Sequence, residues 1–196
     1  MEKLPQLLGF GGKPYSGKDT VADWLVDNAD FTKVNMSAAI ADFGAIVNPI
    51  VGRAPGIRGL FGKLERYNDV VARRGFTDAK NHPEVRRFLQ DIGTAVRDIV
   101  DRDAWAKIAG RTIQAHREAG RSVVLSGVRF PSEARIISEA GGSLVWVTRP
   151  GIEGSNGDGH LVENSIDASY FDTELANDGT LAELEAKSAA LVKAGA

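Results

Sequence analysis

The sequence predicts an α/β fold, in which a parallel sheet of about five strands lies between two layers of helices. Three observations favour this fold. Short apolar runs alternate along the chain with longer segments of helical spacing. A glycine-rich turn joins the first apolar run to the first helical segment. The chain has 196 residues, 43% of them hydrophobic and 26% charged, which suits one globular domain with a sizeable core.

Each expected element follows from this alternation. The apolar runs are short, as is typical of strands buried on both faces, and the helical segments between them supply the right-handed crossovers of a parallel sheet. The expected strands span residues 6–10, 31–36, 122–125, 143–148 and, with a weaker pattern, 173–176. The expected helices span residues 17–27, 37–46, 60–74, 84–100, 103–119, 131–140 and 180–194.

Neither a linker nor an internal repeat divides the sequence, so we expect one domain over residues 1–196. Residues 47–83 interrupt the alternation with Gly, Pro and Arg, which indicates an insertion that covers a binding site. Residues 150–164 contain the stretch GIEGSNGDG. This composition fits a lid-like loop that orders over a ligand or a plain surface loop, and by itself it favours the surface loop.

Composition excludes several classes of function. The formal net charge of −2 provides no broad basic field for nucleic acid, and the absence of cysteine excludes disulfides and thiolate metal sites. The three histidines, His82, His116 and His160, are widely spaced. The first residues lack the features of a signal peptide, and no run reaches the ~18 apolar residues of a membrane span. We therefore expect a cytoplasmic protein that does not bind membranes or nucleic acid.

The turn after the first expected strand carries the clearest motif. Residues 12–18 read GKPYSGK, which fits the phosphate-binding pattern G-x-x-x-x-G-K between a strand and a helix. Gly12 and Gly17 let the backbone approach a phosphate, where successive N–H groups and the helix N-terminus favour negative charge. Lys18 would reach the β and γ oxygens of a nucleotide. The expected nucleotide-binding residues are Gly12, Ser16, Gly17, Lys18, Asp19 and Thr20.

The residue after the lysine departs from the general motif, where a Ser or Thr hydroxyl binds Mg²⁺. Here Asp19 occupies that position, so Asp19, directly or through water, or Thr20 would have to hold the metal. The later strand at 122–125 has no acidic residue at its end, which argues against motor-type ATPases. The guanine-reading Asn-Lys-x-Asp of GTPase switches is also missing.

A polar stripe follows the expected helix 84–100. At 100° per residue, Arg86, Gln90, Gly93 and Arg97 fall within about a 60° arc at the edge of the apolar face. Arginine forks suit a phosphate, and a glycine would let a ligand approach the backbone. The alternative is a solvated face whose arginines pair with nearby aspartates.

Two further arginines follow expected strands, where ligands bind in open α/β sheets. Arg129 comes after the strand 122–125 and Arg149 after the strand 143–148. Each alone could be an ordinary loop arginine, but with Lys18 they predict cations gathered at one end of the sheet. A nucleoside monophosphate brings its own anionic nucleophile, so its kinase needs charge neutralisation more than a general base. Trp105 and Trp146 fit a core role better than base stacking.

Together these motifs resemble the deoxynucleoside monophosphate kinases of tailed bacteriophages, a branch of the P-loop nucleoside monophosphate kinases. The resemblance covers nearly the whole chain, in four matches: residues 12–22 with GKDT, 86–94 with Arg97 and Trp105, 127–134 (GVRFPSEA) with 141–142 and 147–150, and 177–181 with Leu184. The last match is the family's turn near the adenine side. One mismatch lies at 160–163 (HLVE), where relatives tend to have His-x-Ser-Glu. Val162 lacks that hydroxyl, and His160 with Glu163, as a pair in a polar loop, fit a solvated position better than a contact with a nucleotide.

The resemblance implies a P-loop three-layer αβα sandwich with a helical substrate-binding insertion, with ATP and Mg²⁺ as cofactors and a deoxynucleoside monophosphate (dNMP) as phosphoryl acceptor. It implies the host cytoplasm if the protein is phage-encoded. It assigns acceptor binding to Arg86, Gln90, Gly93, Thr94 and Trp105, to which the stripe adds Arg97. Lys18, Arg129 and Arg149 are the expected catalytic residues. A dephospho-coenzyme A kinase and a non-catalytic nucleotide-binding module remain alternatives, and a homodimer is compatible with the sequence.

Overall fold

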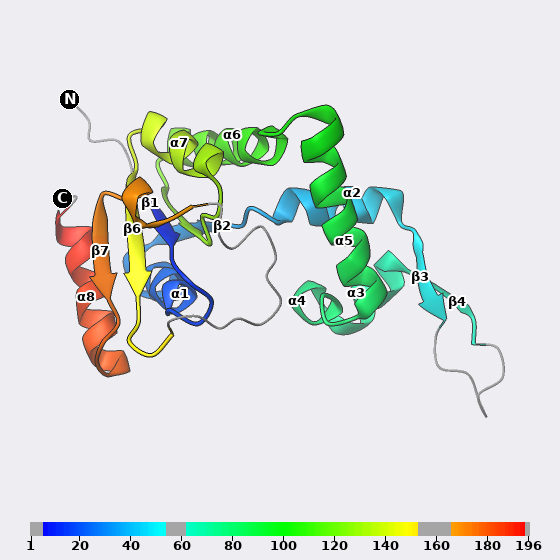
Figure 1. Cartoon of the computed structure of the whole chain (residues 1–196), viewed down its shortest axis with the longest axis horizontal. Helices are drawn as coiled ribbons and strands as arrows, with labels where there is room; N and C mark the ends of the chain where they lie inside the picture. The colour runs from blue at the N-terminus through cyan, green and yellow to red at the C-terminus, as the bar shows by residue number, and fades with distance from the viewer. Residues whose placement is uncertain (1–5, 54–61, 153–165, 195–196) are drawn as a thin grey trace. The chain divides into compact units, whose positions relative to one another are not determined.

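The computed structural model describes residues 6–53, 62–152 and 166–194 (Figure 1). Its contacts group into two compact units. The first, here called the sheet unit, comprises Met1–Met36 and Ala106–Ala196, and the second, the helical unit, comprises Ser37–Trp105. The helical unit contains the expected insertion at 47–83 and extends beyond it on both sides.

The sheet unit is built on five parallel strands. In chain order they are β1 (Leu7–Gly11), β2 (Phe31–Val34), β5 (Ser122–Ser126), β6 (Ser143–Thr148) and β7 (Thr173–Ala176). Across the sheet the order is β2-β5-β1-β6-β7, and every neighbouring pair is parallel. The expected fold class and all five expected strands are confirmed, with ends shifted by at most two residues.

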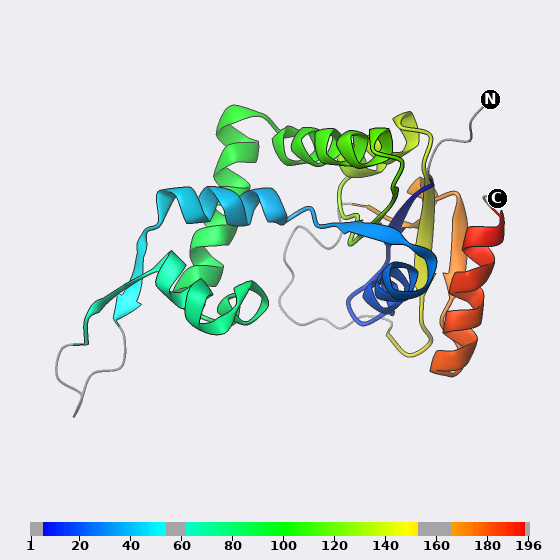
Figure 2. The same cartoon turned by 180° about the vertical axis from the view of Figure 1, so that it is seen from behind.

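Helices cover both faces of this sheet (Figures 1 and 2). Helices α1 (Lys18–Ala29) and α8 (Leu181–Ala194) contribute to the core on one face, and α6 (Ala104–Glu118) and α7 (Pro131–Glu139) to the core on the other. Strand β1 serves both cores: Leu8 and Phe10 belong to the first, and Leu7 belongs to the second. This alternation follows the two-residue period of a strand and explains why β1 is apolar throughout.

The topology indicates the edge of the sheet at which a ligand would bind. The central strand β1 pairs with β5 on one side and β6 on the other. In open α/β sheets, ligands bind outside the carboxyl ends of the strands, where the strand order reverses. The loops that follow β1, β5 and β6 meet at that edge.

The helical unit has its own small core. It consists of α2 (Ala38–Val47), a two-stranded antiparallel sheet of β3 (Ile50–Arg53) and β4 (Leu64–Arg66), α3 (Tyr67–Arg74), α4 (Phe76–Ala79), α5 (Pro83–Ala95) and the π-helix η2 (Val96–Val100). Buried apolar side chains from β3, α3, α4 and α5 pack together. The carboxylate of Glu65, only 4% exposed, is paired with Arg73 across β4 and α3.

Two expected helices in this unit differ from the structure. Within the span 60–74, Leu64–Arg66 forms strand β4, and the helix begins at Tyr67. The pairing of β3 with β4 is irregular, because its register shifts from Ile50 to Gly52. The two strands therefore lack the regular alternation of apolar and polar residues by which a strand is predicted. The span 84–100 is α-helical to Ala95 and then continues as the π-helix. The helical spacing changes there, and Ile99 in this segment is 81% exposed.

Among the residues that the structure describes, every helix is too short or too polar to cross a membrane.

Candidate active site

The turn after β1 is held in an unusual backbone conformation. Gly12, Tyr15 and Gly17 all have positive φ, of 133°, 64° and 103°. The N–H of Ser16 donates to the carbonyl of Lys13 at 3.2 Å, which closes the turn. A Cβ at position 12 would lie 2.4 Å from the carbonyl oxygen of Val147 on β6, so the loop can pack against the strand only with glycine there.

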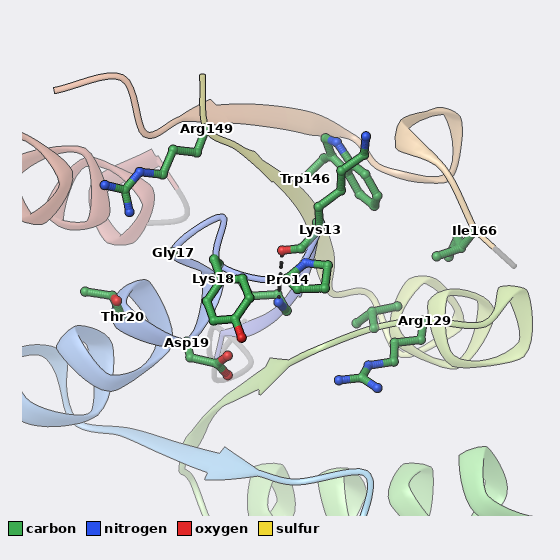
Figure 3. A pocket seen from close by; sticks show the side chains of 13 residues that line it. Lys13, Pro14, Gly17, Lys18, Asp19, Thr20, Arg129, Trp146, Arg149 and Ile166 are labelled. Carbon is green, nitrogen blue, oxygen red and sulfur yellow. Dashed lines mark hydrogen bonds between the residues drawn. The ribbon is translucent and has the colours of Figure 1, made fainter. Parts of the chain in front are cut away.

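Lys18 is the first residue of α1 and folds back over this turn. The residue is only 8% exposed, and its Nζ donates to the carbonyl oxygen of Lys13 at 3.2 Å (Figure 3). A cation on a largely buried side chain is stabilised by anions, and a bound phosphate would add such an interaction. The same loop leads into the N-terminus of α1, where unpaired N–H groups favour negative charge.

Ser16 adds a polar group with no partner inside the described part of the chain. The residue is 1% exposed, and its Oγ is buried without a hydrogen bond among the described residues. A buried hydroxyl of this kind costs free energy unless something bonds to it. Glycines without room for a Cβ, a largely buried lysine and an unsatisfied hydroxyl together fit the phosphates of a nucleotide.

Asp19 and Thr20 follow on the exposed first turn of α1. The side chain of Asp19 is 65% exposed and lies 4.0 Å from Nζ of Lys33 on β2. Lys33 bonds more closely to Asp23, at 2.7 Å, so the Asp19 carboxylate stays open to solvent. The carboxylate of Asp19 and the hydroxyl of Thr20, the two candidate metal ligands, are therefore both on exposed residues. Within residues 6–53, 62–152 and 166–194, no group of three or more acidic or histidine side chains could hold a metal ion.

A single cavity of about 520 Å³ brings the loop and two arginines together (Figure 3). Arg129 follows β5 and Arg149 follows β6, so the two arginines come from the strands on either side of β1. Lys18 lines the same cavity. Its lining consists of Gly12, Lys13, Pro14, Tyr15, Gly17, Lys18, Asp19, Thr20, Val128, Arg129, Trp146, Arg149 and Ile166. Four cationic side chains, those of Lys13, Lys18, Arg129 and Arg149, thus line one space at the carboxyl edge of the sheet.

Several residues of this site were not predicted from the sequence. Trp146, expected in the core, packs against Phe171 with ring centroids 4.9 Å apart and also lines the cavity. Tyr15 is 82% exposed at the tip of the loop. The carboxylate of Glu133 on α7 accepts the backbone N–H of Arg129 at 2.7 Å. One sequence signal could have indicated the contact between Glu133 and Arg129. Residues 130–133 have a proline at the first position of the helix and a glutamate two residues later, which is typical of a capped helix start.

The expected acceptor-binding residues lie in the helical unit. Arg86, Gln90, Gly93 and Thr94 are on α5, Arg97 is on η2, and Trp105 is in the first turn of α6. Arg86 and Gln90 are exposed. Because Arg97 lies beyond the change to π-helical spacing, the 100° arc that grouped it with Arg86 does not extend to it.

Gly93 and Trp105 are brought together. The indole N–H of Trp105, a residue only 8% exposed, donates to the carbonyl of Gly93 at 3.0 Å. A Cβ at Gly93 would meet Cδ1 of Ile40 on α2 at 3.5 Å, an ordinary contact. This tryptophan therefore ties α6 to α5, and the space beside Gly93 borders an apolar side chain. His160, Glu163 and most of the lid-like loop lie outside the described residues.

The parallel sheet, its strand order and the phosphate-binding loop after β1 define a P-loop kinase fold. Solved structures share it: a dephospho-CoA kinase from Campylobacter jejuni (10% identity, TM-score 0.51, 98% of each chain covered) and a Mycobacterium tuberculosis APS kinase in complex with AMPPNP and APS (12% identity, TM-score 0.50, 97% of this chain and 99% of that one). At these identities the likeness concerns the fold alone.

Sequence comparison shows to which family within the P-loop kinases the chain belongs. The model of the deoxynucleotide monophosphate kinase family matches residues 64–188, and the chain belongs to this family. A curated relative, the uncharacterized protein ORF77 of Ictalurid herpesvirus 1 (strain Auburn), is 29% identical over 181 residues, which cover 91% of this chain. The match spans 66% of that relative's length. The expected family is thereby confirmed, although this relative comes from a herpesvirus and not from a bacteriophage.

Proposed function

We propose that this kinase transfers the γ-phosphoryl group of ATP to a deoxynucleoside monophosphate, giving the diphosphate and ADP. The observation that carries the proposal is the position of Lys18, Arg129 and Arg149 around one cavity at the phosphate-binding loop. Membership of the deoxynucleotide monophosphate kinase family supports this choice of acceptor.

The loop residues would hold the donor. The backbone of Gly12 and Gly17, the buried hydroxyl of Ser16 and the ammonium of Lys18 form the donor set for phosphate oxygens. Asp19 and Thr20 are the candidate positions for Mg²⁺, whether directly or through water, because both are exposed beside the loop. When bound, ATP with Mg²⁺ supplies the transferable phosphoryl group and part of the charge neutralisation.

The cations of the cavity would act on the charge of the reaction. In the transfer, an oxygen of the acceptor phosphate forms a bond to the γ-phosphorus as the bond to the β,γ-bridging oxygen breaks. Negative charge is spread over the equatorial, attacking and leaving oxygens. Lys18, Arg129 and Arg149 can neutralise this charge from fixed positions, which is the main way in which a protein accelerates phosphoryl transfer. The acceptor oxygen is already anionic, so the reaction needs no general base.

Acceptor binding is proposed for the helical unit. Arg86 and Gln90, exposed on α5, offer the planar fork and the amide that suit a phosphate and a base. Arg97 and Thr94 are proposed to contribute from the same segment. Gly93 and Trp105 are proposed to shape the site, since their mutual hydrogen bond fixes the start of α6 against α5.

A panel of acceptors tests this function. ADP formation from ATP is measured with each of the four common dNMPs, their ribose counterparts, dephospho-coenzyme A and no acceptor. We expect ADP that depends on at least one dNMP. Formation of ADP with dephospho-coenzyme A alone would assign another kinase activity, and tight ATP binding without transfer to any acceptor would indicate a nucleotide-binding module. Either result would refute the proposal.

A further inference from the structure

A residue far away in the sequence holds the phosphate-binding loop. Asn177 comes directly after β7, and its side-chain Nδ2 donates to the carbonyl oxygen of Ser16 at 2.9 Å. The two residues are 161 positions apart, and the bond is buried. Asn177 itself is 9% exposed. A buried amide–carbonyl bond is protected from competing water, so it restrains the loop more firmly than an exposed one would.

The bond restrains a particular peptide group. The carbonyl of Ser16 and the N–H of Gly17 belong to the same planar peptide, and none of the described peptide bonds is cis. In a trans peptide the carbonyl and the N–H point in opposite directions. While Asn177 holds the Ser16 carbonyl, the N–H of Gly17 must point away from Asn177. Gly17 lines the cavity and precedes the first turn of α1, where N–H groups are available to an anion.

Packing makes this arrangement specific. A Cβ on Gly17 would lie 2.5 Å from Nδ2 of Asn177, so the asparagine fits directly against the glycine. The loop also needs restraint, because Tyr15 has a φ of 64°, which is unfavourable for a residue with a Cβ. Such conformations persist only where the surroundings enforce them.

Asn177 is itself held in place by its neighbours. Its backbone N–H donates to the carbonyl of Thr148 at 2.8 Å, and Thr148 directly precedes Arg149. Nζ of Lys187 on α8 donates to the carbonyl of Ala176 at 2.6 Å and pairs with Asp178 at 2.6 Å. The residues on both sides of Asn177 are therefore tied to α8. One asparagine thus connects the phosphate-binding loop with the end of strand β6, directly before Arg149.

We propose that Asn177 is a positioning residue, which fixes the Ser16–Gly17 peptide so that the N–H of Gly17 is presented to the triphosphate of the donor. The proposal rests on the proposed function as far as the donor is concerned. It differs from a contact with the adenine base, because the bond of Asn177 runs to the backbone of the phosphate loop. It therefore requires that Asn177 matter to any ligand with a triphosphate, whether or not a base is attached.

The test compares ATP with inorganic tripolyphosphate, both with Mg²⁺, by isothermal titration calorimetry on the full chain. We expect Asn177→Ala to weaken both ligands by the same factor of about five to ten, as for the loss of one hydrogen bond. Asn177→Asp keeps the size of the side chain but places a carboxylate against the Ser16 carbonyl, so a larger loss is expected. In the kinase assay, the KM for ATP should rise in Asn177→Ala while the KM for the acceptor stays unchanged.

Gln6→Ala is the matched control. Nε2 of Gln6 also donates to a distant backbone carbonyl, that of Val192, at 3.0 Å, and Gln6 immediately precedes β1. Gln6→Ala removes the same kind of bond from the same unit, but at the start of β1 and not at its end, where the phosphate-binding loop follows. The affinities for ATP and tripolyphosphate should therefore stay within about twofold of the wild type. The chemical shift of the Gly17 amide in ¹⁵N NMR spectra gives a second readout. It should move in Asn177→Ala without ligand and remain unchanged in Gln6→Ala.

Each outcome decides the question. Unchanged binding of tripolyphosphate by Asn177→Ala, a loss confined to ATP, or an equal loss in Gln6→Ala would overturn the proposal. If Asn177→Ala does not fold, the isosteric Asn177→Asp is judged by the same criteria. A wild-type protein that binds both ligands but phosphorylates no dNMP would refute the proposed function and leave this inference standing. A wild-type protein that binds neither would refute both.

Discussion

The carboxylate of Glu133 accepts the backbone N–H of Arg129 at 2.7 Å and that of Phe130 at 3.2 Å. Glu133 lies in the first turn of α7 and is only 8% exposed. One side chain therefore caps the helix and fixes the backbone of an arginine that lines the cavity. Helix stability and the position of a proposed catalytic charge are linked at this point.

Removing this carboxylate should affect both properties. We expect Glu133→Ala to lower the free energy of unfolding by about 1–2 kcal/mol, measured by urea denaturation, because two partly buried hydrogen bonds at the helix start are lost. We also expect kcat to fall by about tenfold or more, since Arg129 is no longer held in position. Glu133→Gln retains an acceptor oxygen and should recover part of both. Glu139→Ala, at the exposed end of the same helix, is the control and should change neither by much.

Substitution of Lys18 should lower the activity of the protein without lowering its stability. Lys18 is only 8% exposed, so Lys18→Met replaces a largely buried charged side chain by an apolar side chain of similar length. We expect a thermal midpoint at or above that of the wild type, with turnover reduced by about 10²- to 10³-fold. The exposed Lys107 on α6 offers a control substitution, Lys107→Ala, that should retain wild-type turnover. Wild-type turnover in Lys18→Met would refute the role of the loop.

Two glycines with positive φ should respond differently to alanine. Gly17 has a φ of 103° and no room for a Cβ, whereas Gly120, at a φ of 77°, has nothing within 4 Å of that position. Gly120→Ala should cost only the strain of a left-handed residue, roughly 1–2 kcal/mol in the free energy of unfolding, and leave ATP binding intact. Gly17→Ala should in addition displace Asn177 and abolish ATP binding in calorimetry. Equal ATP affinities in the two variants would contradict the assigned loop geometry.

Acid should weaken the turn that leads into α8. The backbone N–H of Thr180, and then its hydroxyl, donate to Glu183 and lower the pKa of this carboxyl. A carboxyl whose pKa is lower in the folded state stabilises the protein above its unfolded pKa, about 4.3, and this contribution disappears as the pH falls through the folded pKa. The free energy of unfolding should therefore decrease more steeply in the wild type than in Glu183→Gln between about pH 6 and about pH 3. Parallel pH profiles would contradict this link.

The fold of the sheet unit could be predicted because its signals are local. Strand β1 alternates between two cores and is apolar throughout, and the phosphate-binding loop follows it directly with Gly12, Gly17 and Lys18 at fixed spacing. The positions of Arg129 and Arg149 after their strands followed from the rule that strand ends meet at one edge of a parallel sheet.

The remainder depends on partners that are distant in sequence or on irregular geometry. Nothing near Asn177 in the sequence indicates that its amide reaches Ser16, 161 residues away. Strand β4 has three residues and an irregular register, and the π-helix after Ala95 breaks the periodicity on which the stripe from Arg86 to Arg97 was based. Trp146 was expected in the core and does pack there, but it also lines the cavity. Burial alone did not distinguish these two roles.

The central claim, phosphoryl transfer to a dNMP at the cavity of Lys18, Arg129 and Arg149, is tested most directly by following the reaction with ³¹P NMR. The protein is mixed with ATP, Mg²⁺ and the best acceptor of the panel, and all phosphorus resonances are recorded over time. The account predicts that the signals of ADP and of the deoxynucleoside diphosphate grow equally while ATP and dNMP decrease, and that Lys18→Met slows this change by about 10²- to 10³-fold. Appearance of inorganic phosphate without any deoxynucleoside diphosphate, or no change at all, would contradict it.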